Sequence, residues 1–167
     1  MVRGAAMAVS RVEPTNQWAE TTTMALGVET EAPKSRQARV QRLSARAFIG
    51  SPWPRNAAGI SSDPQFGNMV LIGMGGIFAE SIRDVSMRMP PIDQQMAAEM
   101  LEELRGVDVL HGARGRPEAD LAALVDVLVA LGDIAIDLGG RLVELDINPL
   151  FALPAGALAG DALLVVA

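Results

Sequence analysis

Cysteine and tyrosine are absent from this sequence of 167 residues, and histidine occurs once, as His111. Without cysteine the chain has no disulfide, thiolate metal site or cysteine nucleophile, and it suits a reducing cytoplasm. One histidine leaves little basis for a histidine metal cluster or a serine-hydrolase triad. No apolar run reaches the roughly 20 residues of a membrane span, and the start of the chain lacks the apolar core of a signal peptide. We therefore expect a cytoplasmic protein that does not bind a membrane.

Positive charge is scarce in the second part of the chain. Residues 1–58 hold eight of the 14 basic residues and four of the 20 acidic ones, so six basic and 16 acidic residues lie in residues 59–167. The two parts thus carry about +4 and −10. The only lysine, Lys34, lies in the first part. Nucleic-acid binding draws most of its affinity from phosphate contacts by Lys and Arg, so we expect no nucleic-acid partner.

Residues 1–58 show little sustained periodicity, because single apolar residues are scattered among Ser, Thr, Pro, Arg and Gln. Such a segment cannot bury enough apolar surface to offset the entropy lost on ordering. We predict that it is mostly disordered, with at most a marginal helix around residues 35–47. Its basic residues suit either a solvated tail or an interaction arm. The folded part is predicted to begin at residue 59.

From Gly59 onward, apolar residues recur at spacings typical of regular elements. The predicted order is strand, helix, helix, strand and strand, at residues 69–72, 93–106, 117–139, 141–147 and 157–166. Asp93 is a favourable N-cap for the first helix, and Pro117 suits the first turn of the second. A turn at residues 154–156 folds the last two strands into a hairpin. This order predicts an α/β fold in which helices and sheet form separate layers.

Three oxygen-bearing side chains recur at strand spacing in the segment Glu144-Leu145-Asp146-Ile147-Asn148-Pro149-Leu150. Alternation places Glu144, Asp146 and Asn148 on one face of a strand that Pro149 is expected to end. Carboxylate and amide oxygens suit Mg²⁺, which usually sits where a nucleotide phosphate completes its shell. The hairpin brings Asp161 opposite the vicinity of Asn148, and one residue of register decides whether it reaches the same face. The alternative is the solvent-facing side of an amphipathic strand, with Asp161 a surface acid near a turn.

A glycine-rich segment, Gly73–Gly76, directly follows the predicted strand at residues 69–72. Residues without Cβ let backbone N–H groups approach an anion closely, so Gly75 and Gly76 are candidates for a nucleotide-phosphate site. The segment lacks the Gly-Lys-Ser/Thr of a Walker loop and the full dinucleotide fingerprint, and a tight strand-to-helix turn is the alternative. Glu80 is either part of this site or a first-turn acid that complements a helix dipole.

The loop Gly112-Ala113-Arg114-Gly115-Arg116 precedes the second predicted helix. Arg114 and Arg116 offer guanidinium groups, whose fork suits a phosphate or a carboxylate. Structural salt bridges in an otherwise acidic region are the alternative. His111, beside them, is interpreted as an ordinary loop residue.

Three segments, taken in order, resemble the NDP-forming (ADP-forming) acyl-CoA synthetase family: DPQFGNMVLIGMGGIFAE at 63–80, GARGRPEADL at 112–121 and ELDINPL at 144–150. More narrowly, residues 59–167 resemble the carboxyl-terminal part of that family's ATP-grasp domain, which is related to the nucleotide-binding subunit of succinyl-CoA synthetase. The resemblance implies a partial ATP-grasp domain with a mixed sheet and flanking helices. Residues 1–58 do not resemble the family, and a frameshift or a misassigned start is one source of such a segment.

The resemblance implies a ligase reaction that interconverts acyl-CoA, ADP and phosphate with acid, ATP and CoA. Its cofactors are Mg²⁺ and ATP or ADP, with CoA bound elsewhere in the complete enzyme. Asn148 and Asp161, with Asp146 and Glu144 beside them, match the positions that hold Mg²⁺ against the nucleotide phosphates.

Other parts of the family's site match only in part. Gly75, Gly76 and Glu80 match the glycine-rich segment of the nucleotide cleft, and Arg114 and Arg116 match a Gly-x-Arg-Gly-Arg loop without an assigned role. The family's first ATP-grasp subdomain and its CoA-binding region, which carries a phosphohistidine, find no match in this sequence. The resemblance therefore implies that these parts are partners and that the chain is inactive alone. The competing interpretation is a non-catalytic regulatory or assembly module of a protein acetyltransferase or another partner.

Overall fold

The computed structural model describes residues 37–38, 53–75 and 84–167. In these ranges the strands are β1 Gln37–Ala38, β2 Arg55–Asp63, β3 Gly67–Met74, β4 Val85–Arg88, β5 Leu142–Ala152, β6 Ala157–Ala159 and β7 Ala162–Val166. The helices are α2 Gln94–Glu102 and α3 Leu121–Leu138, with short 3₁₀ helices η2 Val107–Val109, η3 Ala113–Gly115 and η4 Gly139–Arg141. Most of the segment predicted to be disordered lies outside the described residues, so that expectation stays a prediction. Within it, β1 pairs with the outer edge of β7, where a marginal helix was expected.

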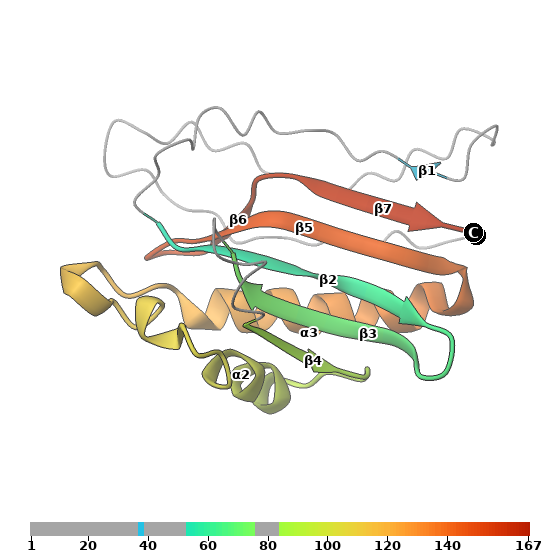
Figure 1. The fold of residues 1–167 in the computed structure, drawn as a ribbon, viewed down its shortest axis with the longest axis horizontal. Coiled ribbons are helices and arrows are strands. Elements are labelled where there is room, and N and C mark those ends of the chain that lie inside the picture. Colours follow the sequence, from blue (N-terminus) through green and yellow to red (C-terminus); the bar gives the residue numbers. More distant parts are fainter. Residues whose placement is uncertain (1–36, 39–52, 76–83) are drawn as a thin grey trace.

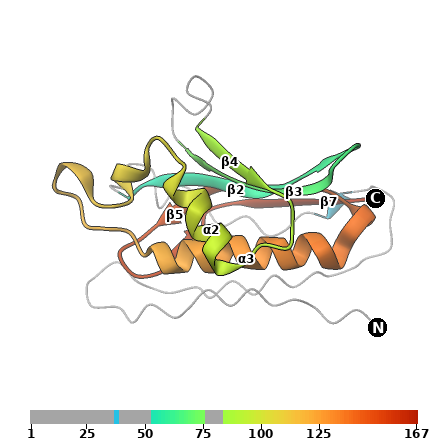
Figure 2. The same cartoon turned by 90° about the horizontal axis from the view of Figure 1, so that it is seen from below.

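The strands form one sheet in the order β1-β7-β5-β2-β3-β4, and β6 pairs with β5. Every pairing among the described strands is antiparallel, where the resemblance implied a mixed sheet. Helices α2 and α3 cover one face of the sheet, which we call the helix face, and no described helix covers the other, the open face (Figures 1 and 2). The predicted α/β class with separate layers is confirmed.

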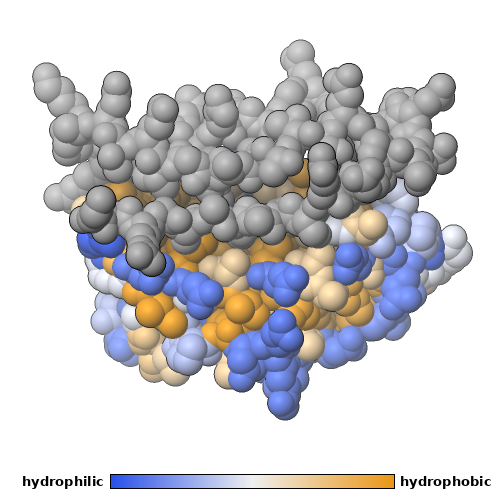
Figure 3. All heavy atoms as spheres, turned by 180° about the vertical axis from the view of Figure 1, so that it is seen from behind, coloured by the Kyte–Doolittle hydropathy of each residue, from blue (hydrophilic) through white to orange (hydrophobic). Residues whose placement is uncertain are grey.

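The main core lies between the helix face and the two helices. Its fully buried side chains come from both layers, among them Ile60 and Ile72 of the sheet and Leu124, Leu128 and Leu131 of α3. Burial of each such side chain stabilises the fold by roughly 1.5–3 kcal/mol. Seen from behind the sheet, the described surface mixes hydrophilic and hydrophobic residues (Figure 3). The buried apolar residues of both helices, which include Met100 and Leu101 of α2, belong to one cluster with those of the sheet.

Strand β2 lies at the centre of the sheet, between β3 and β5. It begins at Arg55, so the boundary predicted at residue 59 falls inside this strand. Its core-facing residues are Asn56, Ala58 and Ile60, and neither an amide nor a small side chain gives a strong apolar strand signal. The two neighbouring strands, rather than local propensity, therefore account for the first half of β2.

The side chain of Asp63 holds the turn between β2 and β3. Its Oδ1 accepts the backbone N–H of Gln65 at 2.7 Å and that of Phe66 at 3.0 Å. Gly67 has a φ of 78°, a conformation that favours glycine. The strand predicted at residues 69–72 is confirmed within β3.

Helix α2 begins as predicted, because Oδ1 of Asp93 accepts the backbone N–H of Met96 at 2.8 Å. After the helix, the buried carboxylate of Asp84 accepts the N–H groups of Arg105 and Gly106 at 2.8 and 2.9 Å. This carboxylate fixes the end of the α2 segment to the residue that precedes β4.

Helix α3 begins at Leu121 and not at Pro117. Oδ1 of Asp120 accepts the N–H of Ala123 at 3.0 Å, while its Oδ2 accepts the N–H of Gly156 at 2.8 Å. Asp120 is therefore the N-cap, and the same carboxylate holds the turn that follows β5. Pro117 lies before the helix because this cap, with its long-range partner, outweighs the preference of proline for a first turn.

Strand β5 runs through Pro149, which was predicted to end it, as far as Ala152. Between Ile147 and Leu150, β5 contains one residue more than the opposing stretch of β2. A bulge of this kind leaves a residue outside the regular ladder, so a proline without an N–H is tolerated there. The prediction was wrong because sequence gives no sign of the bulge.

A second irregularity, against β7, lies between Leu142 and Glu144. Strict alternation with Leu145 and Ile147 predicts a buried Val143, yet this side chain is 45% exposed. The irregularity shifts the alternation by one residue, so that Leu142 is the buried one. From Leu145 to Ile147 the predicted pattern holds.

Candidate functional site

The candidate metal residues of β5 stand on the open face. Asp146 pairs with Gly59 of β2, Gly59 pairs with Leu71 of β3, and Leu71 pairs with Met87 of β4. A Cβ on Gly59 would stand 2.2 Å from the backbone oxygen of Leu145, so β2 and β5 approach this closely only with glycine there. On the side toward β2, the neighbour of Asp146 is therefore a glycine without a side chain. Beyond it lie the apolar residues Leu71 of β3 and Met87 of β4.

Asp146 lies in an acidic neighbourhood. Burial raises the pKa of its carboxyl, and the negative charges of Glu144 and Asp161 raise that pKa further. The three carboxylates therefore lie close enough to repel one another through their charges. A bound divalent cation would offset their mutual repulsion.

The return of the chain after β5 brings Asp161 to Asn148, as the hairpin predicted. The backbone N–H of Asn148 donates to the backbone oxygen of Asp161 at 3.2 Å, and the N–H of Gly160 donates to that of Pro149 at 2.7 Å. The single strand predicted at residues 157–166 is interrupted here and forms β6 and β7. The interruption faces the bulge of β5, so both strands leave regular geometry at the candidate site.

The side chains at this point fit a metal site with one or two protein ligands. Asn148 is exposed, and Oδ1 of Asp161 accepts the N–H of Ala162 at 3.1 Å. Among the described residues no group of three or more His, Asp or Glu side chains is arranged to hold a metal. Mg²⁺ usually keeps several waters and binds through one or two protein oxygens plus phosphate. A pair formed by Asn148 and Asp161, with Asp146 nearby, fits that requirement.

Gly75 follows β3 and lies against the start of β2. Its N–H donates to the backbone oxygen of Arg55 at 2.8 Å, and a Cβ on Gly75 would stand 2.8 Å from the same oxygen. Glycine is therefore required by a close backbone contact, and this N–H is engaged within the protein. Gly76 and Glu80 lie outside the described residues, so their expected roles stay predictions.

Arg55 is a charged residue for which no role was predicted, because it falls in the segment 1–58 that was predicted to be disordered. It is exposed and faces Phe151 of β5, while the next residue, Asn56, is buried on the helix face. Alternation therefore places Arg55 on the open face, in phase with Gly59. The spacing of Arg55, Ala57 and Gly59 is the only signal in the sequence that points to this position.

The arginine loop lies between α2 and α3, at the end of the molecule where α3 begins (Figure 1). Arg114 belongs to η3, and its side chain is outside the described part of the structure. Arg116 is exposed in extended backbone after η3. Gly112, with a φ of 85°, closes the loop, because a Cβ there would stand 2.7 Å from the backbone oxygen of Arg116. The structure gives the loop a fixed backbone, and its predicted role stays a prediction.

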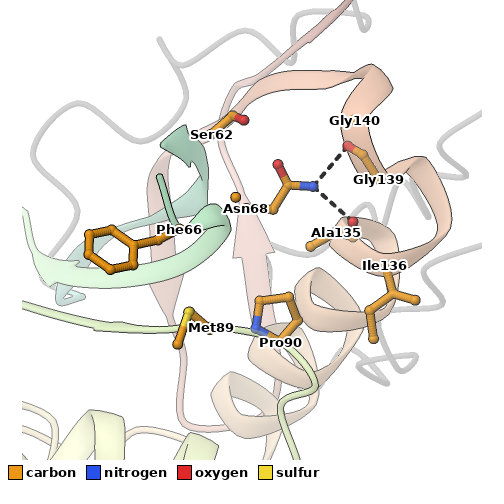
Figure 4. A pocket seen from close by; sticks show the side chains of 10 residues that line it. Ser62, Phe66, Asn68, Met89, Pro90, Ala135, Ile136, Gly139 and Gly140 are labelled. Carbon is orange, nitrogen blue, oxygen red and sulfur yellow. Dashed lines mark hydrogen bonds between the residues drawn. The ribbon is translucent and has the colours of Figure 1, made fainter. Parts of the chain in front are cut away.

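A cavity of about 360 Å³ lies near the turn between β2 and β3 (Figure 4). At its centre the side-chain amide of Asn68 donates to the backbone oxygens of Ala135 and Gly139, at 2.9 and 3.0 Å, and so holds the end of α3. Gly139 ends the helix as predicted. None of the site residues predicted from sequence lines this cavity.

Comparison with known proteins identifies relatives of this chain. The sequence profile of the ATP-grasp domain matches residues 18–166, a range that begins well before residue 59 and so includes part of the segment set apart above. The beta subunit of ADP-forming acetate–CoA ligase I of Pyrococcus furiosus is 43% identical over 108 residues, 65% of this chain and 46% of that subunit. An ADP-forming acetate–CoA ligase of Methanocaldococcus jannaschii is 40% identical over 128 residues, 75% of this chain and 18% of that ligase.

A solved structure of similar fold is the dinucleotide-forming acetyl-coenzyme A synthetase 1 of Ca. Korarchaeum cryptofilum, in complex with coenzyme A and Mg-AMPPCP. It is 36% identical with a TM-score of 0.66, and the match covers 70% of this chain and 54% of that one. The chain therefore spans about half the length of the Pyrococcus subunit and of this synthetase chain. In the described part of the structure, no helix is long and apolar enough to cross a membrane.

Proposed function

Because the chain belongs to the ATP-grasp domain family, we propose that it is the part of an ADP-forming acyl-CoA synthetase that holds Mg²⁺ and the nucleotide phosphates. The observation that carries this proposal is the meeting of Asn148 and Asp161 at the β5 bulge, with Asp146 beside them on the open face. Two carboxylates and an amide oxygen are the donors that a hard cation prefers.

The residues of the chain divide the work between them. Asn148, at the β5 bulge, and Asp161, in the break between β6 and β7, hold the cation, and Asp146 and Glu144 add negative charge that favours a divalent ion. Arg55, on the same face, offers a guanidinium group to the phosphates. Bound Mg²⁺ supplies charge neutralisation when a phosphoryl group passes to or from the nucleotide.

The open face also supports a partner. On edge strand β4, Val85 and Met87 are 50% and 49% exposed on this face, where a solvated antiparallel sheet would present polar residues. The match covers about half of the Pyrococcus subunit and 18% of the Methanocaldococcus ligase, and the resemblance implies a first ATP-grasp subdomain across the nucleotide. We therefore assign that subdomain to the open face, with a CoA-binding region as a further partner and the cytoplasm as the location.

His111 is not suited to carry the phosphoryl group of such a reaction. Its Nε2 lies 3.0 Å from Oε1 of Glu102, and its Nδ1 lies 3.7 Å from Oε1 of Glu118. A phosphate on either nitrogen would meet a carboxylate of like charge. The phosphohistidine of the proposed reaction must come from another region, and the chain alone is expected to be inactive.

The metal site is tested by titrating the 167-residue chain with Mn²⁺, a paramagnetic substitute for Mg²⁺, and following free Mn²⁺ by electron paramagnetic resonance. Asp161→Asn should weaken Mn²⁺ binding about tenfold or more. Asp126→Asn, which removes an exposed carboxylate from α3, is the matched control and should leave the affinity unchanged. Equal affinities for the parent and Asp161→Asn would refute the assignment.

Nucleotide binding tests the need for a partner. Isothermal titration of the 167-residue chain with Mg-ATP should give millimolar affinity or weaker, because the proposed cleft is completed by a first ATP-grasp subdomain on the open face. Submicromolar binding would show that the first subdomain is not needed. If the assembled protein binds Mg-ADP but forms no ATP from acyl-CoA, the domain is a regulatory or assembly module instead.

A further inference from the structure

Gly160 lies between the end of β6 and the start of β7, directly before Asp161. It is buried, and a Cβ at this position would stand 3.0 Å from Cε2 of Phe151 and 3.0 Å from Cγ of Pro149. Gly160 is not among the glycines with positive φ, so its backbone would accept another residue. Space, and not conformation, therefore requires glycine here.

Phe151 and Pro149 form the wall against which Gly160 packs. The side chain of Phe151 is only 2% exposed, yet it is not part of the main core, to which its neighbours Leu150 and Ala152 belong. Alternation thus places Phe151 on the side of the sheet opposite the main core. A second, smaller packing unit therefore lies beside the candidate metal residues.

Two backbone hydrogen bonds join this packing unit to those residues. The N–H of Gly160 donates to Pro149 at 2.7 Å, and the N–H of Asn148 donates to Asp161 at 3.2 Å. The bonds form a closed corner, because residues 148 and 149 are consecutive within β5 and residues 160 and 161 are consecutive in the break between β6 and β7. A shift at Gly160 must be carried to Asp161, the next residue.

We propose that Gly160 is a positioning residue, whose contact with Phe151 and Pro149 sets the place of Asp161 relative to Asn148. This inference rests on the proposed function, because the corner matters only if Asn148 and Asp161 bind the metal ion. A methyl group at position 160 must displace its neighbours by a few tenths of an ångström. Mg²⁺ demands near-ideal octahedral geometry, so a displacement of that size in one ligand lowers affinity while the main core stays intact.

Three variants of the full chain separate this role from a general effect on folding. Gly160→Ala should weaken Mn²⁺ binding about tenfold. Gly140→Ala is the matched control, because a Cβ there meets nothing within 4 Å and its φ is not positive. Gly160→Ala combined with Phe151→Leu should regain part of the affinity, because the shorter side chain relieves the contact with residue 151 but not that with Pro149.

A second readout needs no metal. Hydrogen exchange of the Asn148 N–H, measured by NMR, should be faster in Gly160→Ala and unchanged in Gly140→Ala. If Gly160→Ala does not fold, Phe151→Leu alone should loosen the corner and speed the same exchange. Unchanged exchange and affinity in Gly160→Ala would overturn the inference, provided that Asp161→Asn weakens Mn²⁺ binding. No effect of Asp161→Asn would instead overturn the proposed function.

Discussion

The helix face and the open face are built from alternate residues of the same strands, yet they differ in kind. The helix face presents Ile60, Ile72 and Leu145 to two helices, whereas the open face presents Asp146 and, beyond Gly59, exposed apolar side chains. One face removes apolar surface from water, and the other gathers like charges that repel one another. Stability and the proposed binding function are thus assigned to opposite sides of one sheet.

The largest expected effect comes from comparing a leucine that packs against the helix face with one on the open face. Leu128→Ala, at a fully buried position of α3, should lower the free energy of unfolding by about 3 kcal/mol, because it leaves a cavity in the core. Leu163→Ala, 41% exposed on β7, should lower it by about 0.5 kcal/mol or less. Urea unfolding measures both. Similar losses would mean that the open face is as important to stability as the helix face.

Asn56 is the exception on the helix face, since its side chain is fully buried and neither amide atom has a hydrogen-bond partner among the residues that the structure describes. Asn56→Leu should raise the free energy of unfolding by about 1–3 kcal/mol, because it removes a desolvated polar group. Asn68→Leu is the opposite case, because the Asn68 amide holds the end of α3 through two hydrogen bonds. This substitution should lower the free energy of unfolding by about 1 kcal/mol. A loss of stability in both variants would indicate that Asn56 has a partner in the folded protein.

Asp146 should show stability and binding changing in opposite directions. At neutral pH, Asp146→Asn should raise the free energy of unfolding, since it removes a carboxylate repelled by Glu144 and Asp161, and should weaken Mn²⁺ binding. Asp126→Asn again serves as the control for loss of one exposed charge. Thermal unfolding with and without Mn²⁺ measures both quantities. A variant that is less stable and binds Mn²⁺ as well as the parent would contradict the division between faces.

The smallest effect concerns pH and lies on the helix face. Hydrogen bonds from Ser86, at 2.7 Å, and from Arg88 lower the pKa of Glu103. A lowered pKa in the folded state adds stability above the ordinary glutamate pKa, which is lost as pH falls through the lowered value. Glu103→Gln should therefore be less stable than the parent at pH 7, and the difference should vanish as the pH falls below the lowered pKa of Glu103. Ser86→Ala should reproduce most of this difference, and a gap that widens in acid would reverse the sign assigned here.

Local signals in the sequence predicted the elements whose causes are local. The N-cap of α2 at Asp93 and the end of α3 at Gly139 follow from residues within one turn of the boundary. The start of α3 did not, because Asp120 is held in part by Gly156, a residue distant in sequence. The first half of β2 was missed for the same reason, since its small residues form a strand only between two partners.

The candidate site was predictable in composition but not in geometry. Strand spacing and the hairpin brought Asp146, Asn148 and Asp161 to one region, as the structure shows. The β5 bulge, by contrast, depends on pairing with β2, and no residue of β5 predicts it. Pro149 was therefore interpreted as the end of a strand, although it lies within one.

The position of β2 between β3 and β5 also sets an order of events during synthesis. Arg55 pairs with Phe151, so the centre of the sheet cannot close until almost the whole described chain has been made. Contacts between residues so far apart in sequence slow folding, because the loop between them must be ordered first. Until then the hairpin of β2 and β3 has a free edge, along which a second nascent chain could pair. A ribosome-bound chain is therefore most exposed to misassembly just before β5 emerges.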